Sequence, residues 1–151
     1  MKGFELRKLS PAFYEQYPES KYPEMEHKEN RPYMVLLITI KTNRFALPFR
    51  TNIRHKYCYS FKNSSRDTQS ITGIDYTKAV IINNDIYLGE PATIDDKEYL
   101  DISRKHYFII KQFENYLDGY IDYIKHGGNE YKTKKYAYAT LKYFHTELEL
   151  E

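Results

Sequence analysis

"YMVLLITIKTNRFALPF", residues 33–49, is the stretch of the chain that most strongly determines the fold. Its first eight residues form an unbroken apolar run rich in β-branched side chains, which predicts a central strand. Polar Lys41, Thr42 and Asn43 interrupt this run, and a second strand-like segment, "RFALPF", follows at 44–49. A short polar break between two such runs predicts a β-hairpin over residues 33–49.

Shorter strand-like segments lie on both sides of this hairpin. Residues 4–9, "FELRKL", alternate in part, and residues 56–61, "KYCYSF", alternate strictly between faces. "KAVII" at 78–82 and "IYL" at 86–88 flank the polar residues 83–85, a pattern that predicts a second hairpin. We therefore expect about five or six strands, joined mostly as hairpins in an antiparallel sheet.

The hydrophobic period becomes helical after Pro91. Asp95, with Glu98 three residues later, resembles a capping box and predicts the start of a helix. Its expected apolar face is Ile102, His106, Ile109, Phe113, Leu117, Tyr120 and Ile124. Gly127 and Gly128 predict its end, and Asn129 is expected to cap a final helix. The apolar stripe of that helix is Ala137, Leu141, Phe144 and Leu148. These C-terminal helices are expected to cover the sheet, which gives an α+β fold.

The segment 11–32 contains four of the six prolines and charges of both signs. It predicts an extended loop with one helical turn at residues 12–17. Loops of this length inside a small domain often carry function.

Composition restricts the classes of protein. The 151 residues predict one domain, 1–151. The single cysteine, Cys58, excludes an intramolecular disulfide and favours a reducing cytoplasm. No apolar run is long enough to cross a bilayer. Phosphate-binding glycine loops, HExxH and nucleophile-elbow motifs are absent, and the carboxylate pairs at 95–96 and 24–26 fit caps and solvated turns better than a metal site. We therefore expect no cofactor and no metal.

Charge is distributed unevenly along the chain. The segment 30–66 contains no Asp or Glu but eight basic residues: Arg31, Lys41, Arg44, Arg50, Arg54, Lys56, Lys62 and Arg66. The remainder carries 15 basic and 21 acidic residues. A basic block in an otherwise acidic chain predicts a surface that attracts phosphate, with a solvated basic face as the simpler alternative.

The most concentrated part of this block is "PFRTNIRHKY", residues 48–57. Its cations and neutral hydrogen-bonding groups suit RNA cleavage without a metal, because RNA supplies its own 2′-hydroxyl nucleophile. His55 can exchange a proton near neutral pH, and Arg50 and Arg54 can stabilise charge on phosphate oxygens. Thr51 and Asn52 can position the phosphate or the hydroxyl.

Further residues are candidates for a wider RNA-binding groove. Tyr33 can either pack in the core or direct its hydroxyl into the site. The expected RNA-binding set is Lys28, Arg31, Lys56, Phe61, Lys62 and Arg66, in which Phe61 would stack on a base. The other four histidines have structural interpretations at helix ends, on a helix face or in the proline-rich loop.

The segments "NRPYMVLLITI", "FALPFRTNIRHK", "YSFKN" and "GIDYTKAVIINNDIYL" together resemble the ToxN/AbiQ family of type III toxin–antitoxin endoribonucleases, in particular its CptN/TenpN branch. The resemblance implies a strongly twisted antiparallel sheet like the core of the MazF/Kid toxins. It also implies metal-independent RNA cleavage that leaves a 2′,3′-cyclic phosphate and a 5′-hydroxyl. The implied partner is a small structured RNA antitoxin, typically a pseudoknot, that the toxin cuts from a repeated precursor and with which it forms a closed hetero-oligomer. Phage defence by abortive infection is the implied biological role.

The family pattern matches the candidate site in part. A Thr or Ser pair followed by Lys in the family corresponds to Thr51, Asn52 and His55 here, and a family lysine corresponds to Tyr33. Two other classes remain open: a nucleic-acid-binding module without catalysis, and a metal-dependent nuclease. RNA cleavage that persists in a chelator would exclude both.

Overall fold

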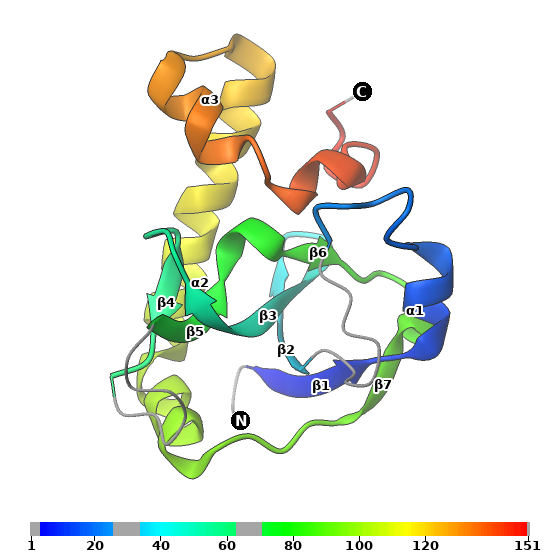
Figure 1. The fold of residues 1–151 in the computed structure, drawn as a ribbon, viewed down its shortest axis with the longest axis vertical. Helices are drawn as coiled ribbons and strands as arrows, with labels where there is room; N and C mark the ends of the chain where they lie inside the picture. The colour runs from blue at the N-terminus through cyan, green and yellow to red at the C-terminus, as the bar shows by residue number, and fades with distance from the viewer. Residues whose placement is uncertain (1–3, 26–33, 63–70, 151) are drawn as a thin grey trace.

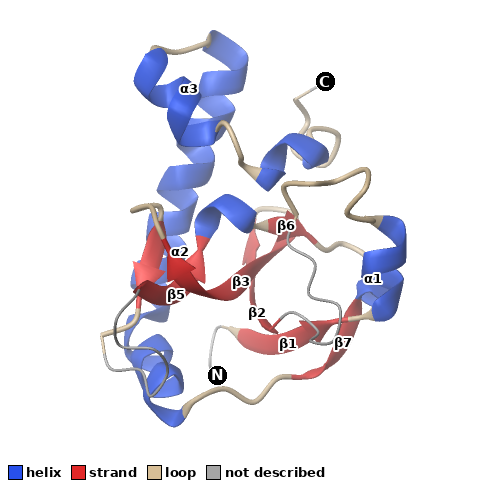
Figure 2. Ribbon diagram, viewed as in Figure 1, coloured by secondary structure: helices blue, strands red, loops and turns tan. Residues whose placement is uncertain are grey.

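The computed structural model describes residues 4–25, 34–62 and 71–150 and has an α+β fold (Figures 1 and 2). Within these ranges the antiparallel sheet has seven strands, in the order β4-β5-β3-β2-β1-β7, with β6 paired to β3. The strands are β1 Glu5–Leu9, β2 Met34–Ile40, β3 Asn43–Ile53, β4 Cys58–Ser60, β5 Ile71–Asp75, β6 Val80–Ile81 and β7 Leu88–Pro91. The helices are α1 Pro11–Gln16, α2 Asp96–His126 and α3 Glu130–Tyr136, with short 3-10 turns η1 Tyr76–Lys78, η2 Asp85–Tyr87 and η3 Thr140–Phe144.

The predicted central hairpin is confirmed. β2 and β3 pair from Val35 opposite Pro48 to Ile40 opposite Asn43, and Lys41 has the positive φ, 57°, of a tight turn. On its other side β3 pairs with β6 at residues 45–46 and with β5 from Phe49 onward. Pro48 lacks an N–H, and it lies between these two paired segments.

The second predicted hairpin is wrong. β6 pairs with β3, and the chain then turns at η2, where the Asn84 side chain accepts the Ile86 N–H. This turn carries β7 to the opposite end of the sheet, where Leu88 pairs with Leu9 of β1. β5 adds a strand that the sequence pattern did not predict, so the sheet has seven strands rather than five or six.

α2 begins and ends where the sequence predicts. The Asp95 carboxylate accepts the N–H groups of Lys97 and Glu98, and Gly127 ends the helix with φ of 73°. The Phe113 ring is fully buried and its centroid lies 5.2 Å from that of Phe45 on β3. Burying one such ring stabilises the fold by about 2–3 kcal/mol. α2 therefore packs across the sheet beside β3, as Figure 2 shows.

The final helix is shorter than its apolar stripe predicts. Asn129 caps α3 as expected, but the helix ends at Tyr136 and η3 follows. The buried Thr140 hydroxyl donates to the carbonyl oxygens of Thr77 and Ala79, at 3.2 and 2.5 Å. These contacts with the segment before β6 explain why the chain leaves the helical path.

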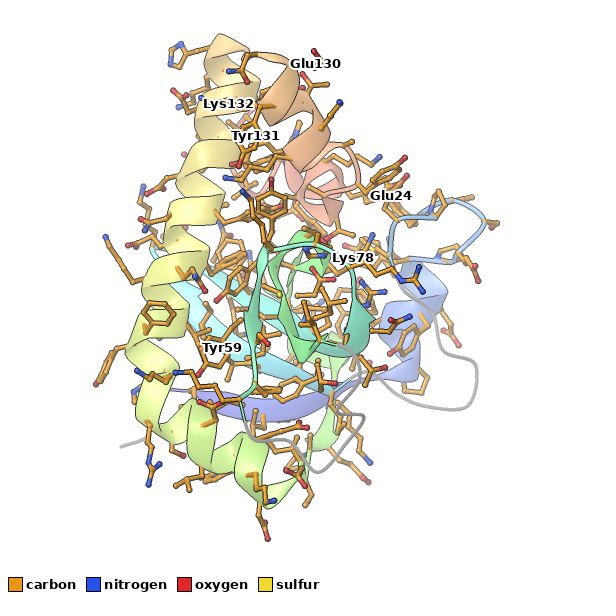
Figure 3. All side chains as sticks on the ribbon, turned by 60° about the vertical axis from the view of Figure 1, so that its left-hand side comes forward. Glu24, Tyr59, Lys78, Glu130, Tyr131 and Lys132 are labelled. Carbon is orange, nitrogen blue, oxygen red and sulfur yellow. The ribbon has the colours of Figure 1, made fainter. Side chains whose placement is uncertain are left out.

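The described part of the proline-rich segment packs against the C-terminal residues. α1 matches the predicted helical turn, and Phe13 on it is buried. Glu24 accepts a hydrogen bond from the Tyr143 hydroxyl and pairs with Lys142 at 3.1 Å. Residues 11–25 therefore fasten the C-terminal segment to the sheet (Figures 1 and 3).

Candidate functional site

A β-bulge at the end of β3 positions the exposed part of the site. Arg50 pairs with Gly73 of β5, but the next pair is Ile53 with Ile71, so β3 carries one extra residue between them. Thr51 and Asn52 fill this interval with exposed side chains, and Asn52 has the positive φ, 54°, that bulges and turns use. The bulge therefore projects a hydroxyl and an amide into solvent.

A buried carboxylate lies beneath the bulge. Asp75, the last residue of β5, is 0% exposed. Arg50 Nη1 donates to its Oδ2 at 2.6 Å, and the Thr77 hydroxyl and N–H donate to its Oδ1 at 2.6 and 2.9 Å. His55 Nε2 lies 3.2 Å from each carboxylate oxygen. We refer to Arg50, His55, Asp75 and Thr77 as the Asp75 cluster.

The charge of Asp75 is stabilised by this cluster. Burial on its own would raise the pKa of the carboxyl, but the hydrogen bonds from His55, Thr77 and Arg50 hold that pKa below its ordinary value. Asp75 is therefore an anion at neutral pH. It neutralises Arg50 and can stabilise a positive charge on His55.

Both ring nitrogens of His55 have partners. The Tyr57 N–H donates to Nδ1 at 3.0 Å, so Nδ1 carries a lone pair and the proton of the neutral ring lies on Nε2, facing Asp75. The side chain is 30% exposed, and its ring stacks on Tyr57 with centroids 5.9 Å apart. The buried Asp75 carboxylate therefore orients the imidazole through Nε2, and the basic nitrogen Nδ1 accepts a backbone N–H.

The remaining expected catalytic residues are placed unevenly. Arg54 is exposed in the connection between β3 and β4, on the same short loop as His55. Arg50 joins the Asp75 cluster and keeps 24% of its side chain exposed. Tyr33 lies outside the described residues. The end of β3 and the loop that follows it thus combine exposed Thr51, Asn52 and Arg54 with the partly exposed His55.

Part of the expected RNA-binding set is available to solvent. Lys56 is exposed beside Tyr57, and Lys62 is exposed with its N–H donating to Asp101 at 3.2 Å. Phe61 is only 7% exposed and packs against Phe49, so its ring belongs to the core and offers little surface to a base. The expected sites at Lys28, Arg31 and Arg66 lie outside the described residues.

The basic block is less isolated in space than in sequence. Asp75 pairs with Arg50, and Asp85 pairs with Arg44 at 2.6 Å, so acids from later in the chain neutralise two of its cations. Arg54 and Lys56 contribute the exposed positive charge of the loop.

Asp75 and Thr77 belong to the candidate site, and the sequence pattern did not reveal them. The acid-free segment ends at residue 66, and strand pairing brings Asp75 back against it from β5. A local signal was present in "IDYT", because an Asp two residues before a Thr at the end of a strand is typical of a cap that accepts backbone N–H groups. Asp75 caps η1 in this way.

Comparisons with known proteins identify no relative. No family model, no curated protein and no solved structure matches the chain. In the part of the chain that the structure describes, no helix is long and apolar enough to span a membrane. Within the same ranges, no three His, Cys, Asp or Glu side chains gather as a potential metal site.

Proposed function

We propose that this protein is a metal-independent endoribonuclease whose active site is the loop between β3 and β4. The observation that carries the proposal is the buried Asp75, which orients His55 and Arg50 beneath an exposed bulge bearing Thr51 and Asn52. This supplies an oriented imidazole, a planar cation and neutral hydrogen-bonding groups within one short segment. Such a set can cleave a phosphodiester through the RNA's own 2′-hydroxyl.

Each residue has a distinct role in the proposed reaction. The 2′-hydroxyl attacks the adjacent phosphorus, and Arg54 stabilises the negative charge that builds on the non-bridging oxygens. Thr51 and Asn52 hold the phosphate by neutral hydrogen bonds. The 5′-oxygen leaves and takes up a proton from solvent, which balances the proton removed from the 2′-hydroxyl. The products carry a 2′,3′-cyclic phosphate and a 5′-hydroxyl.

His55 acts in this scheme through Nδ1. That nitrogen carries the lone pair and now accepts the Tyr57 N–H, so proton transfer requires the 2′-hydroxyl to replace this donor. The imidazolium that results keeps its Nε2–H on Asp75, whose anionic carboxylate stabilises it. Asp75 is thus a positioning residue for the acid–base group.

The wider biological role rests on the resemblance to ToxN/AbiQ toxins. We propose that the sheet corresponds to a MazF/Kid-like toxin core and that a small structured RNA, typically a pseudoknot, occupies the site as the antitoxin. Toxin and RNA would form a closed hetero-oligomer, and release of the toxin would act in phage defence. Nucleic acid extracted from the protein purified from its native cells should then contain one discrete small RNA species.

Cleavage of a long RNA in EDTA tests the proposed activity. Wild-type protein should cut it and leave cyclic phosphate and 5′-hydroxyl ends, while Arg54→Ala and His55→Ala should each slow cleavage by about 100-fold or more. Arg104→Ala, which removes an exposed arginine from α2, should cut at the wild-type rate. Cleavage that requires a divalent cation would refute the metal-independent mechanism.

A second function, RNA binding without cleavage, is favoured by the Tyr57 N–H that occupies His55 Nδ1. In that case the loop and its cations would hold the phosphate backbone, and the Asp75 cluster would only stabilise the loop. Wild-type protein that binds RNA but leaves it intact, with equal affinity in His55→Ala, would establish this alternative. Equal cleavage by wild type and His55→Ala would retain the enzyme and remove His55 from the chemistry.

A further inference from the structure

A pocket with aromatic and polar walls lies beside the Asp75 cluster. Its volume is about 310 Å³, and two tyrosines of the core form part of its wall. The other residues that line it come from the β3–β4 connection, α2 and α3: Lys56, Tyr57, Gln112, Asn115, Tyr131 and Lys135. Lys56 and Tyr57 directly follow His55, and the Tyr57 ring stacks on the imidazole, so the pocket adjoins the candidate site.

Two larger hollows lie away from the loop. One of about 450 Å³ is found between β1 and residues 91–99, and one of about 600 Å³ lies between the β2–β3 turn and the C-terminal half of α2. Neither is lined by residues 50–57, whereas the 310 Å³ pocket adjoins His55. Its volume is close to the lower end of the range for small-ligand sites, about 300 Å³, which suits a single nucleotide better than a larger ligand.

Besides the two core tyrosines, the rings of Tyr57 and Tyr131 border the pocket. The Tyr57 hydroxyl donates to the Tyr131 hydroxyl at 3.3 Å, and Tyr131 is 52% exposed although it is large and aromatic. Figure 3 shows Tyr131 on α3 between α2 and the tip of the β3–β4 connection. Exposed aromatic rings of this kind provide stacking surfaces for unpaired bases.

The charge of the pocket is positive. Lys56 Nζ lies 5.6 Å from the Tyr131 ring centroid, and Lys135 Nζ lies 5.3 Å from the Tyr57 ring centroid. None of the described residues that line the pocket is acidic. The hydrogen bond from Tyr57 and the neighbouring Lys56 and Lys135 lower the pKa of the Tyr131 hydroxyl, as expected where positive charge gathers. Two ammonium groups beside a stacking surface suit a nucleotide, which carries a phosphate and a base on one sugar.

Two amide side chains complete the polar lining. Gln112 Oε1 accepts the Tyr76 hydroxyl at 2.7 Å, which fixes the orientation of the amide on α2. Asn115 is exposed one turn further along the same helix. Amide groups can donate to and accept from the edge of a base, and this contact distinguishes one base from another.

We propose that this pocket binds one unpaired nucleotide of an RNA. Its base stacks on Tyr131, its edge contacts Gln112 and Asn115, and its phosphate lies between Lys56 and Lys135. The proposal rests on the proposed function for the identity of the ligand as RNA, and it adds a base-reading subsite next to His55.

A single tryptophan tests this subsite, because the chain contains no Trp. Tyr131→Trp places the only indole at the pocket, and Tyr107→Trp places one at a residue of α2 that is 75% exposed and does not line the pocket. The probe is a six-nucleotide single-stranded RNA with 2′-O-methyl groups throughout, which blocks attack by the 2′-hydroxyl. The expected result is saturable quenching of the indole emission in Tyr131→Trp, with the emission of Tyr107→Trp unchanged.

Binding measured by fluorescence anisotropy of the labelled oligonucleotide gives the second readout. Tyr131→Ala should weaken binding by about 10-fold or more, and Tyr107→Ala should leave it unchanged. Oligonucleotide binding without quenching in Tyr131→Trp, or the absence of any binding, overturns the subsite. Cleavage in EDTA by wild-type protein, together with unchanged emission from Tyr131→Trp, would support the nuclease and reject the subsite. Quenching in Tyr131→Trp without cleavage by wild-type protein would support the subsite and reject the nuclease.

Discussion

Replacing Asp75 by Asn removes one negative charge from the centre of the Asp75 cluster while conserving the shape of the side chain. The Asn oxygen can still accept from Thr77, but its NH₂ group then faces Arg50 Nη1 and His55 Nε2–H, which are both donors. The substitution therefore takes away the anion that lies 2.6 Å from a partly buried guanidinium.

The size of the effect follows from burial. A hydrogen bond to a charged group contributes about 1.5–3 kcal/mol, and breaking a buried ion pair by removing one partner costs about 3–5 kcal/mol. The Arg50 side chain is 24% exposed and can rehydrate in part, so we expect a loss near the lower end, about 3 kcal/mol. With a urea m-value of about 2 kcal/mol per molar, the denaturation midpoint should fall by about 1.5 M.

Urea denaturation at pH 7 measures this loss, and Asp85→Asn is the matched control. Asp85 pairs with Arg44 at the same 2.6 Å, but the Asp85 side chain is 85% exposed. Its removal should cost no more than about 1 kcal/mol. Equal effects of the two substitutions would refute the view that burial makes the Asp75 cluster a principal stabiliser of the loop.

The same comparison has a defined pH dependence. The folded-state pKa of Asp75 lies below its ordinary value of about 3.9, so its ionisation stabilises the fold above about pH 4 and loses this effect as the pH falls through the folded-state pKa. The difference in unfolding free energy between wild type and Asp75→Asn should therefore shrink as the pH falls below about 4. A difference that grows below about pH 4 would contradict this assignment.

Three further predictions concern the loop and the sheet around it. Gly73→Ala places a Cβ 1.9 Å from a backbone oxygen of β4 and should lower the free energy of unfolding by at least about 3 kcal/mol, measured by thermal unfolding. Gly127→Ala meets no atom within 4 Å but has a positive φ, so it should lower this free energy by about 1 kcal/mol. Similar losses for the two variants would show that β4 and β5 are not packed as described. Burial and the nearby Asp75 charge raise the pKa of the Cys58 thiol to about 11, so at pH 8 only about one thiol in a thousand is ionised. Ellman's reagent should therefore react with Cys58 only in denaturant. Fast labelling of the native protein would contradict the raised pKa. Nitrogen-15 NMR of neutral His55 should find the proton on Nε2, and a proton on Nδ1 would exclude the backbone hydrogen bond to that nitrogen.

The parts of the fold that the sequence predicts correctly are those with strong local signals. The central hairpin follows from a continuous apolar run broken by a polar turn, and the ends of α2 follow from Asp95 and Gly127. Each of these signals acts within a few residues of its effect, so no knowledge of distant contacts is needed.

The parts that it does not predict depend on distant partners. β7 pairs with β1 and β6 pairs with β3, and each pair joins segments far apart in sequence. From the sequence alone, the polar break at 83–85 cannot be distinguished from the turn of a hairpin between β6 and β7. The stripe from Ala137 to Leu148 fits a helix, but contacts of Thr140 with the segment before β6 override it.

The candidate site shows the same division. The loop 50–56 is evident from its charge and composition, since the cations lie next to one another in the sequence. The Asp75 carboxylate comes from another strand, and Tyr131 and Lys135 come from α3. Phe61 shows the opposite error, because the sequence places its ring near a basic loop and predicts that it stacks on a base. The ring is buried in the core, and its burial depends on contact with Phe49 of β3.

The measurement to make first compares cleavage of two RNAs of identical sequence in EDTA, one unmodified and one with 2′-O-methyl groups throughout. A ribonuclease that uses the substrate's own 2′-hydroxyl should cut the unmodified RNA to products with 2′,3′-cyclic phosphate ends and leave the methylated RNA intact, although both bind. Cleavage of both RNAs at similar rates would contradict attack by the 2′-hydroxyl, and binding of both without cleavage would show that the loop between β3 and β4 holds RNA but does not cut it.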